Sequence, residues 1–382
     1  MVSPRSLQPV PMRRIPFLTP RLPDPSVVAR DYREICETGV FTNSGPFEGR
    51  FAAELARWIG RDVEVAVTAN ATVGIQLACK TLFHRDRRLV PVASFTAAAV
   101  PLALIWSGFE PVLIDIEPKT WQPDLRMAER FLQREDDNVA GILLTSTFGT
   151  ANAAIDAWET LATHYRVPLV IDSAAGFASE YSWGEPLGAR GDCEIFSFHA
   201  TKTMAIGEGG AVVSRDHRFI RRINQLKNFG FDDYRRSWGL GQNGKLPELA
   251  SAMGIRQLEV FKDRLTKRQE VLRWYITELE PLGCAFQSDG SLGVPAFVSV
   301  ALPSQRHREE LRMKLDEVEV GWRAYFNPPI HGHPAFAELQ RAGDLAVTDD
   351  LCGRIISLPL DDWLTQADVG RIVSAVGCVV GH

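Results

Sequence analysis

Between residues 63 and 214 the chain alternates short, uninterrupted apolar runs with longer amphipathic stretches. The apolar runs lack polar alternation, which is typical of strands buried on both faces of a sheet. They occupy residues 63–69, 89–94, 110–116, 139–149 and 167–173. Intervening segments such as 71–83 and 157–166 have the apolar spacing of helices. This order predicts an α/β fold with a mostly parallel sheet flanked by helices on both faces.

The pattern changes after about residue 250, where a long helix is expected over 248–283. Shorter strands and helices follow it to the end of the chain. We therefore predict an extended N-terminal arm over 1–15, a large domain over 16–255 and a smaller α+β domain over 256–382.

The composition argues against nucleic acid and membrane partners. The 382 residues carry a net charge of −5, so no basic excess would attract nucleic acid. The arginine-rich segment 306–312 is interpreted as a solvated helix face. No apolar run approaches the roughly 18 residues of a membrane span, and the N-terminus lacks the apolar core of a signal peptide. A cytoplasmic location is therefore expected.

Six scattered cysteines form no CxxC pair. They are interpreted as buried free thiols in a reducing compartment. The histidines and cysteines show no ligand spacing, so no metal site is expected.

The stretch "EIFSFHATKTMAIGEGGAVVS" (194–214) places Lys202 between two apolar, strand-like runs. A lone lysine in a loop is most often a solvated charge. In a dry pocket, however, its pKa would fall, and the neutral amine could form an imine. Ser197 lies close enough in the sequence to supply a hydroxyl to the same ligand.

Two further features lie at the ends of predicted strands, where open α/β sheets bind ligands. Asp172 ends a buried run and would either cap the next turn or face a cation, such as the pyridinium nitrogen of pyridoxal phosphate (PLP). The backbone N–H groups of Ala71 and Thr72 begin a helix and could hold a phosphate. Alternatively, Asn70 or Thr72 merely caps that helix.

With these motifs in order, the chain resembles the sugar aminotransferases of PLP fold type I, the DegT–StrS group. The resemblance extends from about Phe41 to His331. The matching segments are "FTNSGPFEGRFAAELARWIG", "NATVGIQLA", "ASFTAAAVPLALIWSGFEPVLIDIEPKTWQPD", "ILLTSTFGTAN", "VPLVIDSAAGFASEY", "SFHATKTMAIGEGGAVV", "NFGF", "GQNGKLPELASAMG" and "YFNPPIHGHP".

The resemblance implies a fold type I PLP-dependent transferase, with a PLP-binding large domain. Lys202 would form the internal aldimine with PLP and move the proton between the substrate carbon and the cofactor. Asp172 would bind the pyridine nitrogen. Ala71, Thr72 and the Ser197 hydroxyl would hold the phosphate.

The same resemblance implies a homodimer with shared active sites. Asn243 would reach the phosphate bound by the other subunit, and Lys245 would steer an anionic substrate. Tyr325 and His331 would lie near the sugar nucleotide. For His331, a capped turn beside Pro329 is the alternative.

The implied reaction is a two-stage transamination. An amino donor, with L-glutamate the first candidate, converts PLP to PMP, which then aminates a nucleotide-linked keto sugar. The motifs most resemble enzymes that act on dTDP-4-keto-6-deoxyhexoses. An aminotransferase on a cyclitol or other cyclic ketone, and a weakly active PLP-binding partner or regulatory subunit, remain alternatives. A related sugar dehydratase would carry histidine in place of Lys202.

Two positions depart from the family pattern. Ala97 stands where an aromatic residue usually stacks on the PLP ring, and Ala175 stands where glutamine or histidine is usual. Stacking adds only about 0.5–1.5 kcal/mol beyond area burial, so PLP binding is still expected. Either Phe95 or Phe177 would fill the space, or the cavity would accept a bulkier substrate.

Overall fold

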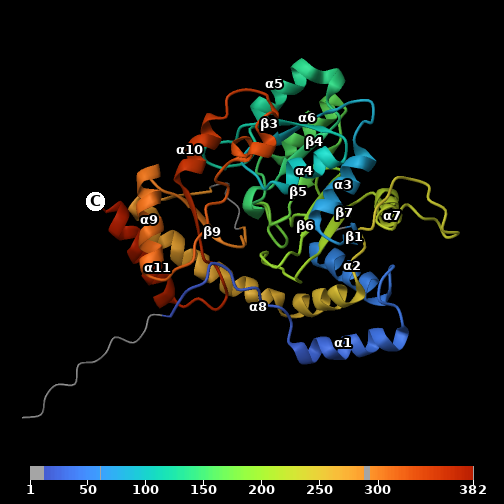
Figure 1. Ribbon diagram of the computed structural model, residues 1–382, viewed down its shortest axis with the longest axis horizontal. Coiled ribbons are helices and arrows are strands. Elements are labelled where there is room, and N and C mark those ends of the chain that lie inside the picture. Colours follow the sequence, from blue (N-terminus) through green and yellow to red (C-terminus); the bar gives the residue numbers. More distant parts are fainter. Residues whose placement is uncertain (1–12, 61, 288–292, 382) are drawn as a thin grey trace, which may run out of the picture.

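The computed structural model describes residues 13–60, 62–287 and 293–381. Its central layer is a twisted sheet (Figure 1). The strands of this layer are β1 (Glu64–Thr68), β2 (Leu89–Ala93), β3 (Glu110–Ile114), β4 (Ile142–Thr145), β5 (Leu169–Asp172), β6 (Cys193–Ser197) and β7 (Gly210–Ser214), with the short β10 (Gln340–Arg341) at one edge. Each apolar run named above contains one of these strands.

The strand order confirms the predicted, mostly parallel sheet. Five strands follow the order β1-β7-β6-β5-β4, and three follow β10-β3-β2. A parallel bridge between Leu89 and Val139 joins β2 to the start of β4. In the five-stranded part only β7 is antiparallel to its neighbours, so β1, β4, β5 and β6 end at the same edge.

Helices cover both faces of the sheet, which explains the continuous apolar runs. In β5, for example, Leu169 and Ile171 join one hydrophobic core and Val170 joins the other. One face packs against α2 (Pro46–Ile59), α5 (Leu125–Glu135), α6 (Ile155–Tyr165) and part of α8 (Glu248–Leu279). The opposite face packs against α3 (Ala71–Leu82), α4 (Ala99–Trp106) and α7 (His217–Leu226). Both faces of each strand therefore exclude water.

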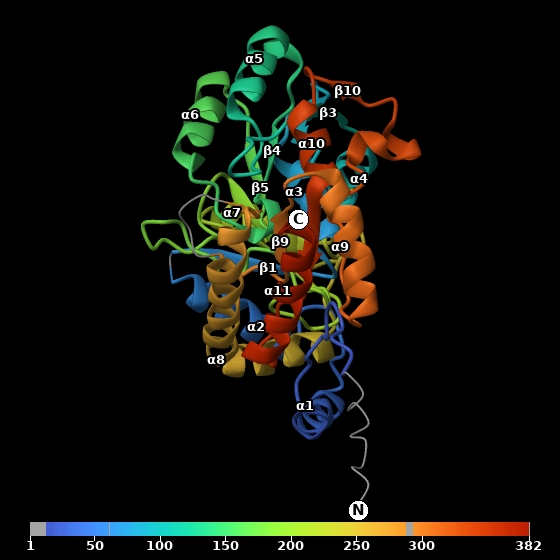
Figure 2. The ribbon, with the colours of Figure 1, turned by 90° about the vertical axis from the view of Figure 1, so that its left-hand side faces the viewer.

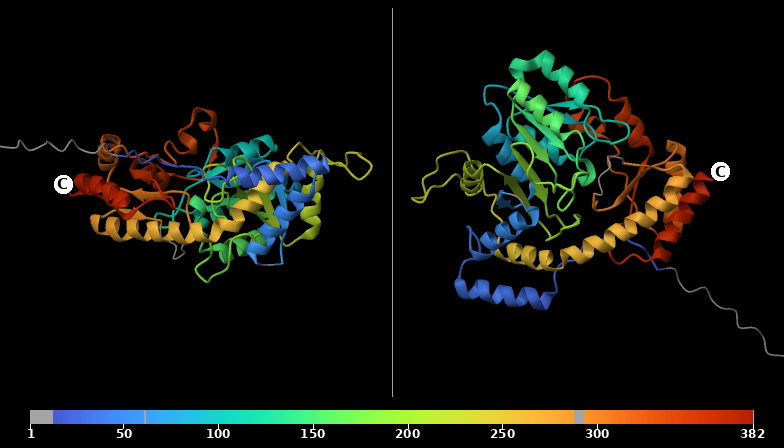
Figure 3. Two further views of the ribbon diagram at one scale, coloured as in Figure 1. Left: turned by 90° about the horizontal axis from the view of Figure 1, so that it is seen from below. Right: turned by 180° about the vertical axis from the view of Figure 1, so that it is seen from behind.

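Helix α8 runs from the large sheet to a second, smaller core (Figures 1 and 3). That core surrounds a three-stranded sheet in the order β11-β9-β8. Its elements are β8 (Ala285–Phe286), β9 (Val298–Ala301), α9 (Gln305–Glu317), β11 (Ile355–Leu358) and α11 (Gln366–Val380), and α10 (Ala346–Arg354) packs between this core and the large sheet. Figure 2 shows α9 and α11 beside the far end of α8. The predicted helix 248–283 is thus α8 followed by a short 3-10 turn.

The N-terminal segment and the C-terminal part cross the predicted domain boundaries. Residues 1–12 of the predicted arm lie outside the described residues, whereas Ile15 is buried in the small core and bridges Val320. Ile330 and Phe336 pack instead with the large core. Helix α1 (Pro25–Thr38) lies along α8 (Figure 1). The division at residue 255 stays a prediction.

Two expectations about side chains are corrected. All six cysteines are free, but Cys36 and Cys378 are exposed rather than buried. In the segment 306–312, Arg306 is solvated, whereas only 12% of the Arg308 side chain is exposed. Arg308 turns inward because its Nη1 donates to the backbone oxygen of Cys352 at 3.2 Å. In the described chain, no helix combines the length and apolar character needed to cross a membrane.

Candidate active site

Reactive side chains gather where the strands β4, β5 and β6 end. The register places Thr145 beside Asp172, and Ser197 beside Gly210 at the start of β7. Gly210 in turn pairs with Thr68 at the end of β1. Segments distant in sequence therefore meet at one edge of the sheet, as expected for a ligand site in an open α/β fold.

A cavity of about 220 Å³ opens at this edge. Lys202 and Asp172 both line it, as do Ala97, Ala175 and Tyr325. The structure thus brings together the predicted reactive amine, the predicted ring-nitrogen partner and both positions that depart from the family pattern.

Lys202 and Asp172 influence each other's protonation. Burial lowers the pKa of Lys202, and the nearby charge of Asp172 opposes that shift. Burial raises the pKa of Asp172. Two contacts oppose this shift: the backbone N–H of Ala174 donates to Oδ1 of Asp172 at 3.0 Å, and Lys202 supplies a nearby positive charge. A lysine with a lowered pKa holds more neutral, nucleophilic amine near neutral pH.

The start of α3 has the properties of a phosphate site. Asn70 caps this helix by accepting the Val73 N–H at 2.9 Å, as the simpler alternative predicted. Within the described chain, the N–H groups of Ala71 and Thr72 still lack an acceptor. A Cβ on Gly210 would lie 2.6 Å from the nitrogen of Ala71, so only glycine permits this close approach.

Ser197 lies two strands away from this helix start. It is buried, and its Oγ accepts the N–H of His199 at 3.3 Å. It is not part of the cavity wall around Lys202. At the start of α3, the cap formed by Asn70 uses the N–H of Val73, and a phosphate would use the N–H groups of Ala71 and Thr72. The two roles are compatible because they involve different N–H groups.

Two residues that the sequence interpretation missed make the cavity suitable for a polar ligand. Thr145 and Thr147 line it at the end of β4, and both are buried. Within residues 13–60, 62–287 and 293–381, their Oγ1 atoms have no hydrogen-bond partner. Buried hydroxyls without partners are unusual unless a ligand or water satisfies them. With Lys202 and Asp172, they fit a small aromatic ring that carries polar substituents, such as PLP.

Aromatic side chains other than the expected ones form the apolar wall of the cavity. Phe148 and Phe326 stack with centroids 5.3 Å apart, and Phe297 lies edge-on to Phe148. Phe95 packs behind Phe148 and Phe326 without lining the cavity. Phe177 is buried among other core rings. Of the two alternatives, the one in which Phe95 or Phe177 fills the space beside the alanines is therefore wrong, and a cavity that accepts a bulkier substrate stays a prediction.

The predicted residues Asn243 and Lys245 do not line the cavity of their own chain. Asn243 is exposed, and the following Gly244 accepts the Ala69 N–H at 2.8 Å beside the start of α3. Lys245 donates to Oδ1 of Asn228 at 3.1 Å.

His331 also lies away from the cavity wall. Its Nδ1 lies 2.6 Å from Oγ of Ser94, and its Nε2 lies 2.8 Å from Oδ1 of Asp349. Because Ser94 is fully buried and both ring nitrogens of His331 are engaged, this arrangement ties the turn to β2. Residues 94 and 349 carried no sequence signal for this contact.

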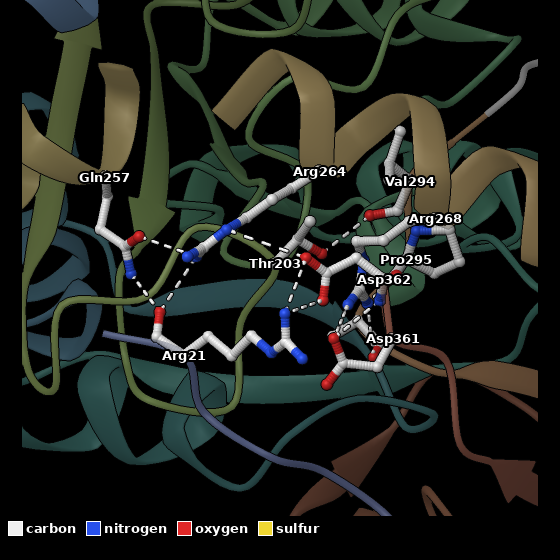
Figure 4. A network of polar contacts seen from close by, with 10 residues as sticks. Arg21, Thr203, Gln257, Arg264, Arg268, Val294, Pro295, Asp361 and Asp362 are labelled. Carbon is white, nitrogen blue, oxygen red and sulfur yellow. Dashed lines mark hydrogen bonds and ion pairs between the residues drawn. The ribbon is translucent and has the colours of Figure 1, made fainter. Parts of the chain in front are cut away.

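A polar network lies on the other side of Lys202 (Figure 4). Arg268 donates from Nη2 to the backbone oxygen of Ala296 at 2.9 Å. Oγ1 of Thr203 donates to the backbone oxygen of Val294 at 3.0 Å. Both contacts anchor the segment that contributes Ala296 to the cavity wall.

A larger cavity of about 1050 Å³ adjoins the first and shares Thr96, Ala97, Tyr325 and Phe326 with it. Its wall contains four arginines and three acidic residues, namely Arg14, Arg308, Arg312, Arg323, Glu309, Asp316 and Glu319. Glu309 pairs with both Arg308 and Arg312. In the part of the chain that the structure describes, no acidic side chain pairs with Arg14 or Arg323.

Known proteins share this fold and much of this sequence. The profile of the DegT/DnrJ/EryC1/StrS aminotransferase family matches residues 27–377. The chain is 44% identical over 369 residues to Protein Rv3402c of Mycobacterium tuberculosis, which covers 95% of this chain and 89% of that protein. A Bacillus cereus structure, assigned as a PLP-dependent aminotransferase, has a TM-score of 0.91 at 30% identity, covering 96% and 100% of the two chains. DesI, solved with its TDP-sugar product, has a TM-score of 0.85 at 29% identity, covering 96% and 93%.

Proposed function

We propose that this chain, which belongs to the DegT/DnrJ/EryC1/StrS aminotransferase family and is a PLP-dependent aminotransferase, acts on a nucleotide-linked keto deoxysugar. The amino group comes from an amino acid, with L-glutamate as the expected donor. The observation that carries the proposal is the shared cavity of Lys202 and Asp172 at the strand ends, next to unpartnered threonine hydroxyls.

The cofactor residues have distinct roles in this proposal. Bound PLP supplies an aldehyde that condenses with amines and a ring that withdraws electrons from the reacting carbon. Asp172 holds the ring nitrogen, and the cationic nitrogen in turn favours the ionised carboxylate. The N–H groups of Ala71 and Thr72 and the Ser197 hydroxyl bind the phosphate.

Lys202 then moves the proton. Its Nζ, with a pKa lowered by burial, would accept a proton from the α-carbon of the amino donor and return it to the cofactor carbon that derives from the aldehyde. The aromatic side chains of Phe148, Phe297 and Phe326 limit the access of water to this amine.

The larger cavity supports a substrate with an extended, anionic part. A nucleotide-linked sugar is longer than the space beside Lys202, and the two cavities share Tyr325 and Phe326 in their walls. The guanidinium groups of Arg14 and Arg323 can bind a phosphate there. Tyr325, which lines both cavities, would contact the sugar. No described contact brings His331 to the same place, and its role at the sugar stays a prediction.

A homodimer is part of the proposal. Asn243 is exposed beside the phosphate-binding helix start, on a projecting segment with exposed Tyr234, Trp238 and Leu240 (Figure 1). Such an apolar projection is typical of a surface that another chain covers. Asn243 would then reach the phosphate in the partner's site, with Lys245 close to the substrate.

A half-reaction assay tests the function. Addition of PLP to the protein should produce the absorbance band of an imine between PLP and Lys202, at about 410–430 nm when the ring hydroxyl is ionised and at shorter wavelength when it is protonated. L-glutamate should remove the band, and one of a panel of nucleotide-linked 3- and 4-keto sugars should restore it. Lys202→Ala should abolish the cycle, whereas Lys119→Ala, at an exposed lysine, should leave it intact. Restoration by free cyclic ketones but by no nucleotide-linked sugar would refute the proposed substrate.

A further inference from the structure

A row of three buried polar side chains leads away from the cavity. Ser146 lines the cavity, and its Oγ lies 3.1 Å from Oγ of Ser173. Ser173 Oγ donates to Oε2 of Glu194 at 2.8 Å. Ser173 and Glu194 are fully buried, each with 0% exposure. A carboxylate buried behind a ligand cavity is costly, which calls for an explanation of its presence.

While Glu194 is ionised, its carboxylate fixes the direction of every hydrogen bond in this row. Oε1 of Glu194 also accepts the N–H of Arg190 at 3.0 Å, and an ionised carboxylate can only accept. Ser173 has a single proton, which it donates to Glu194. The contact between Ser146 and Ser173 is therefore a hydrogen bond only when Ser146 donates. The oxygen of Ser146 keeps its remaining lone pair for a ligand.

The strand order shows which part of the cofactor lies nearest Ser146. In PLP the phosphate arm and the ring hydroxyl flank the carbon that carries the aldehyde, on opposite sides. The proposed phosphate residues Ala71 and Ser197 follow β1 and β6, Asp172 ends β5, and Ser146 follows β4. Because the order is β1-β7-β6-β5-β4, the phosphate lies to one side of Asp172 and Ser146 to the other. The hydroxyl flank of the ring thus faces β4.

We propose that Glu194, acting through Ser173, makes Ser146 a hydrogen-bond acceptor for the hydroxyl of the cofactor ring and thereby keeps that hydroxyl protonated. Glu194 and Ser173 are positioning residues, because only Ser146 reaches the cavity. Ala175, in the same wall, offers no polar group that could do so instead. The inference rests on the proposed use of PLP.

The test uses the substitution Glu194→Gln, which is nearly isosteric. The amide oxygen can still accept the Arg190 N–H, so the amide NH₂ turns towards Ser173 and reverses the row. Ser146 then donates into the cavity and favours the ionised ring hydroxyl. We expect the ratio of the long-wavelength to the short-wavelength absorbance of bound PLP to rise roughly tenfold. Spectra are recorded above the pKa of Glu194, which burial raises to about 7.

A double substitution separates this role from a structural one. In a Ser146→Ala background, Glu194→Gln should leave the absorbance ratio unchanged, because no hydroxyl remains to reverse. Ser173→Ala, which leaves the backbone partners of Glu194 in place, should raise the ratio in the same direction even if the Glu194 variant folds poorly. Ser357→Ala, in the part-buried Ser299–Ser357 pair between β9 and β11, is the control and should not change the ratio.

The outcomes are distinguishable. If Glu194→Gln changes the absorbance ratio equally in the wild-type and Ser146→Ala backgrounds, the inference is overturned, while the proposed function stays intact. No change in either Glu194→Gln or Ser173→Ala, with PLP still bound, would overturn it as well. A wild-type protein that shows no absorbance of bound PLP would instead refute the proposed function, and the inference with it.

Discussion

Replacement of Lys227 by methionine should be among the most destabilising single substitutions in the chain. Only 1% of Lys227 is exposed. Its Nζ donates to Oε1 of Glu48 at 2.6 Å and to the backbone oxygen of Val67 at 2.9 Å. Lys227, at the C-terminal end of α7, therefore joins this helix both to α2 and to the last residues of β1, which lead to the phosphate-binding turn.

The structure sets the size of the effect. Lys227→Met leaves the buried Glu48 carboxylate without its ion-pair partner. Among the described residues, the N–H and hydroxyl of Ser44 remain as hydrogen-bond partners, and Lys245 remains as a nearby positive charge. Breaking such a buried pair costs about 3–5 kcal/mol of unfolding free energy. The double variant Lys227→Met/Glu48→Gln removes both charges and should be more stable than Lys227→Met alone. Replacing a buried pair by neutral groups of similar size is often close to neutral.

Urea unfolding, followed by tryptophan fluorescence at one fixed protein concentration, measures these differences. Arg306→Ala, which removes a solvated pair with Glu310, is the control and should change stability little. A loss below about 1 kcal/mol for Lys227→Met, or additive losses in the double variant, would refute the reasoning.

Four further predictions concern the site and the pH dependence. Lys202→Ala chains and Asn243→Ala chains should each be inactive alone, but an equal mixture should regain about a quarter of wild-type activity. Half of the dimers are then mixed, and one of the two sites in each mixed dimer is intact. No recovery after verified subunit exchange would contradict the shared site. Gly210→Ala places a Cβ 2.5 Å from the first peptide of α3 and should weaken PLP binding, as measured by fluorescence titration. Burial raises the pKa of Asp361 to about 6, so the folded state binds the proton more tightly than the unfolded state. The free energy of unfolding should therefore fall as the pH rises from about 4 to about 6. If Asp361→Asn loses stability with pH as steeply as the wild type does, this prediction is wrong. Arg323→Ala should raise KM for the nucleotide-linked substrate but not for the amino donor.

Much of the fold could be read from short stretches of sequence. The apolar runs located the strands because each strand is only four or five residues long and buries both faces. Asp172 could be recognised because it ends such a run, and Lys202 because it lies in the short segment between two of them. The same local signal places their side chains at the edge of the sheet, where the structure indeed finds them in one cavity.

Other features depend on contacts between distant segments. Glu194 and Ser146 carry no local pattern that would connect them, and they act together only because β4, β5 and β6 lie side by side. Arg308 looked like a surface residue from helical spacing, but a carbonyl in α10 draws it inward. Phe148 and Phe326, from segments far apart in the sequence, come together to form the wall beside Ala97 and Ala175.

The sequence by itself determined the order of strands and helices and the family to which the chain belongs. These features depend on residues a few positions apart, whose spacing matches the period of a helix or a buried strand. Only the tertiary structure decided which hydroxyls, rings and charges surround Lys202. Their proximity comes from the packing of helices and strands far apart in the sequence, and no local period records it.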